Sequence, residues 1–306
     1  MGFRHSLNLL LLLPGTVWGI SFIVVELILP YMGPISLTFL RTCVSSVILY
    51  AMLRALGSYL PREKRLWGHY FGLALSNQAL PFALSSWGQL HITGSLATIL
   101  LAVMPLCTVL LAATFTQDEK LNPMKVAGIT AGLIGTCILV GPSALEGMSL
   151  NIIAQLAVIG SALSYAVGAI YTRYIYRIET KALAPWPLRT RIMATQFICA
   201  MLLLFPFSLF ERVWTIRAPW QAWGYIIFLG IGVTLLATMV YFYLIEHLGA
   251  GIASTTVYLI PVAGVIAGAL VLGERIDLRS FIALLIILMG VFLVNLGKRK
   301  LLTSAP

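Results

Sequence analysis

Ionisable side chains stand inside two of the long apolar runs of this 306-residue chain, where an unpaired charge is costly to bury. Arg41 lies six residues into the run 35–56, about 9 Å from its start at a rise of about 1.5 Å per helical residue. Glu26 lies about 5 Å from the end of the preceding run, 7–29. A guanidinium at this depth suits a carboxylate or phosphate group. The alternative is a structural role, in which Arg41 pairs with Glu26 or reaches the nearby interface.

Amide and hydroxyl side chains recur with helical spacing in the run 67–91. Ser85 and Gln89 follow Gln78 by 7 and 11 residues, so a helix presents all three on one face. Polar groups in an apolar environment need partners, so such a stripe either lines a wet cavity or forms hydrogen bonds between helices. Three polar side chains in register favour the cavity. Pro81 adds a backbone carbonyl that a ligand or a neighbouring helix must satisfy.

Aromatic and further polar side chains in other runs extend this candidate binding site. Trp18 lies near the middle of its run, away from the interfacial positions that tryptophan favours in membranes. Such rings can wall a cavity for an amphipathic or ring-bearing ligand, although helix packing is the alternative for any single ring. The candidate binding residues are Trp18, Arg41, Asn77, Gln78, Ser85, Trp87, Gln89, Tyr165, Gln196 and Tyr243, with Tyr241 as a further wall residue.

The apolar runs dominate the composition. Apolar residues make up 60% of the chain and charged residues 10%, against about 45–50% and about 25% in soluble domains. The mean hydropathy is +0.97. A soluble globule of this composition would expose large apolar patches, so the composition excludes a soluble enzyme, a disordered chain and a fibrous protein. It indicates an integral membrane protein that crosses the lipid bilayer several times.

Turn residues and charge clusters divide the chain into ten apolar runs, and a membrane-spanning helix needs about 20 such residues. The predicted fold is therefore an all-α membrane protein with ten transmembrane helices. The predicted spans are 7–29, 35–56, 67–91, 94–116, 124–142, 151–176, 185–210, 220–246, 250–272 and 278–297.

Loop charge predicts the orientation, because Lys and Arg concentrate on the cytoplasmic side of membrane proteins. With the N-terminus inside, four of the 20 Lys and Arg residues lie on the opposite side, at Arg212, Arg217, Arg275 and Arg279, and Arg41 lies within a span. The other basic residues gather on the side of the N-terminus, and an even number of spans places the C-terminus there too. This distribution explains the net charge of +10 without a nucleic-acid partner.

Two stretches of the chain resemble each other at a distance of 156 positions. HITGSLATILLAVMPL begins at His91 and HLGAGIASTTVYLIPV begins at His247, which aligns Pro105 with Pro261. Five spans in each copy is an odd number, so the second copy inserts upside down relative to the first. Inverted repeats are typical of alternating-access transporters, with a substrate site near the midplane, and the two prolines are candidate hinges.

Short motifs accompany this repeat. They are WGISF (18–22), LTFLR (37–41), DEKL (118–121), IASTTVYLIPVAGVIAGALVLGE (252–274) and LGER (272–275), with TQDEK (116–120) in the first copy at the place of LGER. Together they resemble the EamA branch of the drug/metabolite transporter superfamily. The resemblance implies two EamA repeats of five transmembrane helices, 1–142 and 151–297, and a basic cytoplasmic tail, 298–306. It also implies a bacterial inner-membrane protein that moves small metabolites or drugs, often outward.

The hypothesis for function is a secondary transporter of small organic molecules that works by alternating access, with export favoured. A channel-like facilitator is one alternative, and an integral-membrane enzyme is another. The sequence has no HExxH, no GxSxG and no P-loop motif, so the enzyme lacks the expected chemistry. We expect no catalytic residue, no metal site and no cofactor. Both a monomer and a homodimer are compatible with the sequence.

Three residues are candidates for coupling or ion pairing: Glu26, Arg41 and His91. Glu26 is placed to take a proton from the outside, although its position near the interface weakens this interpretation. His91 titrates near neutral pH, so it is a candidate proton relay, and an interfacial anchor is the alternative.

Overall fold

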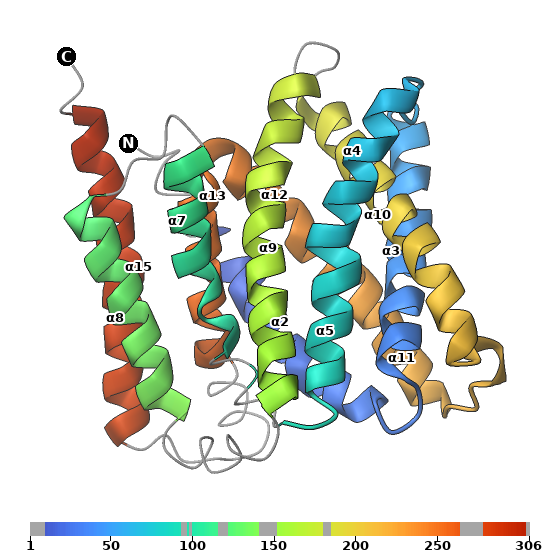
Figure 1. Cartoon of the computed structure of the whole chain (residues 1–306), viewed down its shortest axis with the longest axis horizontal. Coiled ribbons are helices and arrows are strands. Elements are labelled where there is room, and N and C mark those ends of the chain that lie inside the picture. The colour runs from blue at the N-terminus through green and yellow to red at the C-terminus, as the bar shows by residue number, and fades with distance from the viewer. Residues whose placement is uncertain are drawn as a thin grey trace.

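Every element described in the computed structural model is a helix (Figure 1). The structure describes residues 10–92, 97, 100–115, 122–140, 152–179, 185–263 and 278–303. The α-helices are α2 (Leu12–Ile28), α3 (Pro34–Ala55), α4 (Lys64–Ala74), α5 (Leu80–Gly88), α7 (Met104–Phe115), α8 (Pro123–Val140), α9 (Ile152–Glu179), α10 (Pro185–Phe210), α11 (Trp220–Phe228), α12 (Thr238–Leu248), α13 (Ala250–Ala253) and α15 (Leu278–Thr303). The other segments are the π-helical η1 (Leu75–Ala79) and η4 (Leu229–Ala237) and the 3-10 helical η3 (Val213–Thr215) and η5 (Ser254–Tyr258).

Four helical stretches are long and apolar enough to cross a membrane. They are Pro34–Ala55, Ile152–Glu179, Pro187–Phe210 and Trp220–Leu248. Each coincides with a predicted span to within a few residues at either end. Shorter apolar helices lie at Leu12–Ile28, Met104–Phe115, Pro123–Ile138, Ala250–Ala263 and Phe281–Val294. The chain is therefore a multi-pass membrane protein.

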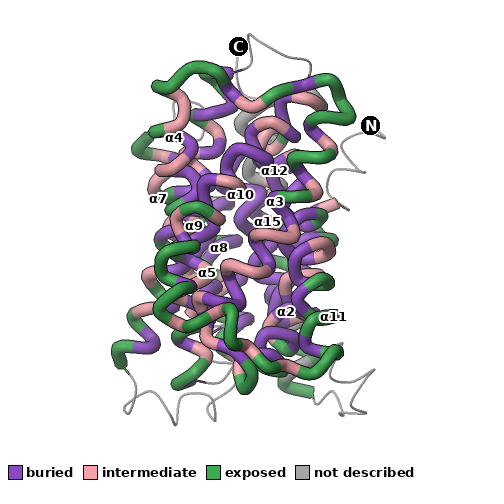
Figure 2. The backbone as a smooth tube through the Cα atoms, turned by 90° about the vertical axis from the view of Figure 1, so that its right-hand side faces the viewer, coloured by how far each residue is buried: buried purple, intermediate pink, exposed green. Residues whose placement is uncertain are grey.

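Burial is arranged as a lipid environment requires. Buried residues fill the interior of the bundle, and exposed residues lie around its outside (Figure 2). Large apolar side chains are among the exposed ones, such as Val47 at 68% exposure and Phe210 at 85%. In water these side chains would form an apolar surface, whereas hydrocarbon solvates them without cost.

The predicted spans 67–91 and 220–246 share an unusual local geometry. Each begins as an α-helix, α4 or α11, passes through a π-helical segment and continues as α5 or α12. Adding the repeat distance of 156 to residues 75–79 of η1 gives 231–235, which lies inside η4. In Figure 1 α4 and α12 lie at one end of the bundle and α5 and α11 at the other, so the two spans run in opposite directions. Such π-helical turns are frequent at functional sites.

Helices α8 and α15 lie side by side at one edge of the bundle (Figure 1) and touch through glycines. A Cβ atom on Gly128 would lie 2.6 Å from the carbonyl oxygen of Gly290. A Cβ atom on Gly290 would lie 2.7 Å from the backbone nitrogen of Gly132. Only glycine permits this approach, as the GxxxG spacing of Gly128 and Gly132 indicates. A second pair with this spacing, Gly264 and Gly268, lies outside the described residues.

The centre of the bundle forms where segments distant in the sequence pack together. Helix α3 packs on α10 and η4, α5 and η1 pack on α9, and α2 packs on η4, η5 and α12. The approach of α3 to η4 is close, because Ser45 Oγ donates to the carbonyl oxygen of Gly230 at 2.7 Å. These segments surround the space in which the site lies.

Both repeat-related prolines lie beside irregular backbone. Helix α7 begins at Met104, directly before Pro105, after a turn at Ala102 and Val103. Pro261 follows the 3-10 segment η5 by three residues. A proline cannot donate the helical hydrogen bond, so regular α-helix is weakest just before it.

Candidate functional site

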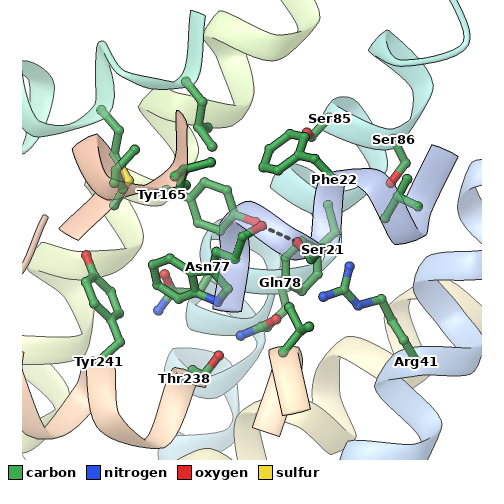
Figure 3. A pocket seen from close by; sticks show the side chains of 18 of the residues that line it. Ser21, Phe22, Arg41, Asn77, Gln78, Ser85, Ser86, Tyr165, Thr238 and Tyr241 are labelled. Carbon is green, nitrogen blue, oxygen red and sulfur yellow. Dashed lines mark hydrogen bonds between the residues drawn. The ribbon is translucent and has the colours of Figure 1, made fainter. Parts of the chain in front are cut away.

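A cavity lies in the centre of the bundle, between α2, α3, η1, α5, α7, α9, η4, α12 and η5 (Figure 3). The volume open to the centres of water-sized molecules is about 80 Å³. A single water molecule needs about 10–15 Å³ on the same measure, so the cavity has room for several. Its polar lining residues are Ser21, Arg41, Asn77, Gln78, Ser85, Ser86, Gln89, Tyr165, Thr238 and Tyr241. Its apolar lining residues are Trp18, Phe22, Val25, Phe82, Leu101, Met104, Val233, Phe242, Val257 and Ile260. An apolar wall with a few convergent polar groups is typical of small-molecule sites.

Among the described residues that line the cavity, Arg41 is the only charged one. Its Nε donates to Thr234 Oγ1 at 2.8 Å, and its guanidinium carbon lies 4.2 Å from the centroid of the Phe82 ring. Its Nη2 is buried without a hydrogen-bond partner. In Figure 3 the guanidinium points toward the middle of the site, where Gln78 lies. A buried, unused donor on a cation costs free energy, and an anionic ligand would satisfy it.

The structure does not bring Glu26 to Arg41. Ser21 and Val25 line the cavity from α2, whereas Glu26 is exposed on the same helix. Successive helical residues are about 100° apart, so Glu26 points away from the space that Val25 reaches. Within the described part of the chain, Arg41 has no ion pair. Its positive charge is held by a hydroxyl and an aromatic ring instead.

The predicted polar stripe lies on the cavity wall, since Gln78, Ser85 and Gln89 all line it. Gln78 and Gln89 each carry a buried Oε1 atom without a hydrogen-bond partner. The amide nitrogen of Gln89 is used within its own helix, where Nε2 donates to the Ser85 carbonyl oxygen at 3.3 Å. The wall therefore offers two unused acceptors in the same cavity as the unused donor of Arg41.

Helix α9 holds the π-helical segment η1 in place. Asn77 lines the cavity, and its Nδ2 donates to Thr172 Oγ1 of α9 at 2.8 Å. Ser164 Oγ, also on α9, donates to the carbonyl oxygen of Ser76 at 2.9 Å. Pro81 has no N–H for the preceding turn, so a carbonyl there needs another donor. A neighbouring helix supplies one, as the position of the proline in the sequence predicts.

Two pairs of aromatic rings form the apolar walls. Trp18 and Tyr241 meet edge to face with ring centroids 5.1 Å apart. Phe82 and Tyr165 meet in the same way at 5.9 Å, and Phe82 also stacks under Arg41. Edge-to-face pairs fix the ring orientations, so these walls are shaped in advance for a flat or apolar body.

Two predicted binding residues lie outside the cavity because of their helical phase. Trp87 is 37% exposed and contacts His91, with ring centroids 4.9 Å apart. Tyr243 is likewise absent from the lining. Each follows a lining residue, Ser85 or Tyr241, by two positions, which is about 200° around a helix. The structure therefore does not bring Trp87 and Tyr243 to the cavity.

Gln196 and His91 also lie away from the cavity. Gln196 is completely buried in α10 without reaching the lining, and neither polar atom of its amide has a hydrogen-bond partner. The sequence indicates how deep Gln196 lies in its membrane span, but not which side of the helix its side chain occupies. His91 is exposed just beyond the end of α5, which is a position for an interfacial anchor rather than for a relay inside the cavity.

Three residues at the site are not among those that the sequence predicts. Ser21 and Val25 lie 3 and 7 residues after Trp18, so their shared helix face was visible in the sequence. Thr234, the partner of Arg41, lies in the apolar segment η4 and carries no comparable pattern. Only the packing of η4 against α3 identifies it.

A helical membrane bundle around a small cavity with an apolar wall and convergent polar groups defines the class of membrane transport proteins. The EamA-like transporter family matches residues 5–141 and 152–296 of this chain. The chain belongs to that family and contains two EamA units.

Known relatives carry transporter names. A protein of Escherichia coli (strain K12) is 25% identical over 95% of this chain and 95% of its own length, and is named "Probable amino-acid metabolite efflux pump". A protein of Streptantibioticus cattleyicolor is 24% identical over 95% of this chain and 94% of its own length, and is named "Probable terminal-alkyne amino-acid exporter". A crystal structure at 21% identity covers 96% of this chain and 99% of its own, with a TM-score of 0.75, so it shares the fold.

Proposed function

We propose that this protein is a secondary transporter that exports small organic molecules carrying an acidic group, by alternating access across the inner membrane. The observation that carries the proposal is the guanidinium of Arg41, which is buried in the cavity wall with an unused Nη2 donor. Guanidinium groups bind carboxylates and phosphates with high specificity. The acidic group of the substrate is the counter-charge of Arg41 in the loaded state.

The remaining wall fits the rest of such a molecule. The unused Oε1 atoms of Gln78 and Gln89 accept hydrogen bonds from a donor on the substrate, such as an ammonium or hydroxyl group. The ring pair of Trp18 and Tyr241 packs against an apolar body. The names of two relatives refer to amino acids. An amino acid can combine an acidic group, an ammonium donor and an apolar side chain. Amino-acid-like carboxylates are therefore the first substrates to test.

Alternating access in this proposal rests on two inverted repeats of five membrane helices, 1–142 and 151–297. The opposite directions of α4–η1–α5 and α11–η4–α12 support it, as does the placement of the two π-helical segments 156 positions apart. The cavity lies where segments of the two halves meet, as expected for such transporters. The irregular backbone beside Pro105 and Pro261 provides the two hinges.

The test is efflux from proteoliposomes loaded with matched pairs of compounds, each a carboxylic acid and its primary amide. We expect saturable flux of the acid and a rate about tenfold lower for the amide, because a hydrogen bond to a charged group is lost. Equal rates for acid and amide would contradict recognition by Arg41. Flux that does not saturate would instead support a channel-like facilitator.

A further inference from the structure

Two partly buried ion pairs lie at one end of the bundle, outside the cavity. Arg191 Nη2 on α10 lies 2.8 Å from Glu179 Oε2 at the end of α9, and the Glu179 side chain is 2% exposed. The hydroxyl of Tyr70 on α4 donates a hydrogen bond to Glu179 Oε1. One carboxylate thus joins three helices.

The second pair joins α10 to α12. Arg189 Nη2 donates to Glu246 Oε2 at 2.7 Å, and Arg189 Nε donates to the same oxygen at 3.3 Å. The guanidinium of Arg189 also lies 4.7 Å from the centroid of the Tyr243 ring on α12. The Arg189 side chain is 6% exposed and the Glu246 side chain is 23% exposed, so the pair is partly shielded from solvent, which strengthens its attraction.

This network lies between the cavity and the end of the bundle at which α4 begins. Along the α4–η1–α5 span, Tyr70 precedes the first cavity residue, Asn77, by about 10 Å at about 1.5 Å per residue. On α12, Glu246 follows the last cavity residue, Phe242, by one turn. None of the network residues lines the cavity. The ion pairs therefore lie on the side of the cavity at which α4 begins.

Among the described residues, the positions that the repeat relates to this network carry no charge. The repeat distance of 156 relates Glu246 to Leu90, Tyr243 to Trp87 and Tyr70 to Ile226, and each of these partners is uncharged. Glu179–Arg191 and Glu246–Arg189 both lie at the end where α4 begins, so the repeat does not duplicate this network at the other end.

One carboxylate near the other end of the bundle has a different role. Glu211 lies just beyond α10, and its side chain accepts hydrogen bonds from the backbone N–H groups of Ile35 and Ser36 at 3.2 and 2.7 Å. It caps the start of α3 and joins that helix to the end of α10. It does not tie together the helices on either side of the cavity.

We propose that Glu179–Arg191 and Glu246–Arg189 are an ion-pair gate that closes the end of the cavity facing the cytoplasm in the predicted orientation. The gate holds α4, α9, α10 and α12 together while the cavity faces the other side, and its pairs separate when the cavity changes sides. This inference rests on the proposed alternating access. It assigns a role to four charged residues, two buried and two partly buried, that the binding site does not use.

The test measures the reaction of a single cysteine with a membrane-impermeant thiol reagent added to one face of oriented vesicles. The probe is Ser86→Cys in the cavity wall, in a protein whose native cysteines are replaced by alanine. With the gate intact, we expect labelling from the side opposite the ion pairs only. In the Glu179→Gln, Glu246→Gln double variant, labelling from the ion-pair side rises at least about tenfold, because buried pairs are strongly weakened by the loss of one partner.

Two controls separate a gate from general loosening. The charge swap Arg189→Glu with Glu246→Arg restores the pair and returns labelling toward the low rate. Glu211→Gln, a carboxylate at the other end, leaves labelling from the ion-pair side unchanged. If the double variant does not yield folded protein, Glu246→Gln alone carries the same test.

Unchanged labelling in the variants, or an equal increase in Glu211→Gln, overturns the gate. Labelling needs no substrate, so its failure is distinct from a failure of the proposed function, which appears as absent carboxylate flux in a protein whose gate still opens and closes.

Discussion

Arg41 on α3 and Thr234 on η4 are joined by a 2.8 Å hydrogen bond between Nε and Oγ1 across 193 positions of the chain. The bond fixes one edge of the guanidinium against the second half of the protein. The Nη2 atom has no hydrogen-bond partner, and in the proposed function it binds the acidic group of the substrate. A π-helical segment of one repeat thus positions the charged group contributed by the other.

Thr234→Val should weaken substrate recognition without removing the charge. Valine has a similar shape and no hydroxyl, so Arg41 loses its positioning partner. We expect the KM for a carboxylate substrate to rise about tenfold, the effect of one hydrogen bond to a charged group, with a smaller change in kcat. Thr42→Val is the matched control, because the Thr42 hydroxyl bonds only within its own helix, to the Thr38 carbonyl oxygen. Equal KM values for the two variants would refute the positioning role.

Gln78→Leu combined with Gln89→Leu tests the acceptors on the cavity wall. Both Oε1 atoms lack partners, so their removal leaves the fold intact and removes the groups that receive a donor from the substrate. We expect a KM increase of about tenfold or more for substrates with an ammonium group, and little change for substrates without a donor. Transport kinetics in proteoliposomes measure both. The same KM as in the original protein would mean that the amides serve helix packing only.

Gly290→Ala should destabilise the contact between α8 and α15. The added Cβ would lie 2.6 Å from the carbonyl oxygen of Gly128, and backbone must shift to make room. Overpacking of this kind costs about 1–3 kcal/mol, which we expect as a lower Tm in detergent. Gly224→Ala is the control, because a Cβ there has no neighbour within 4 Å. A Tm equal to that of the control would show that the contact between α8 and α15 accommodates the added methyl group.

Much of the fold follows from the sequence because membrane helices must be continuous and apolar. The four helical stretches that are long and apolar enough to cross a membrane coincide with predicted spans, and the π-helical segments of the two spans related by the repeat lie at matching positions. The sequence does not reveal that a span is divided by a π-helical turn, since this depends on donors from another helix. Ser164, which donates to η1 from α9, is one of these.

The sequence predicts the site correctly where helical spacing alone determines which side of a helix a side chain occupies. Gln78, Ser85 and Gln89 share a face and line the cavity together. The residue types of Trp87 and Tyr243 suit a binding site, but their positions around the helix place both side chains away from the cavity.

The ion-pair network was hidden for a different reason. Arg189 and Arg191 read as basic residues at the cytoplasmic boundary, whereas helix packing brings them against Glu246 and Glu179. Pairing between distant helices leaves no local pattern in the sequence.

The most direct test of the central claim is equilibrium binding of a carboxylate substrate to purified Arg41→Ala, compared with Arg54→Ala. Arg54 lies on the same helix, stacks on Tyr59 and does not line the cavity, so its loss removes a charge without touching the site. The account predicts a Kd at least about tenfold higher for Arg41→Ala, and an unchanged Kd for Arg54→Ala. Equal Kd values for the two variants would contradict it.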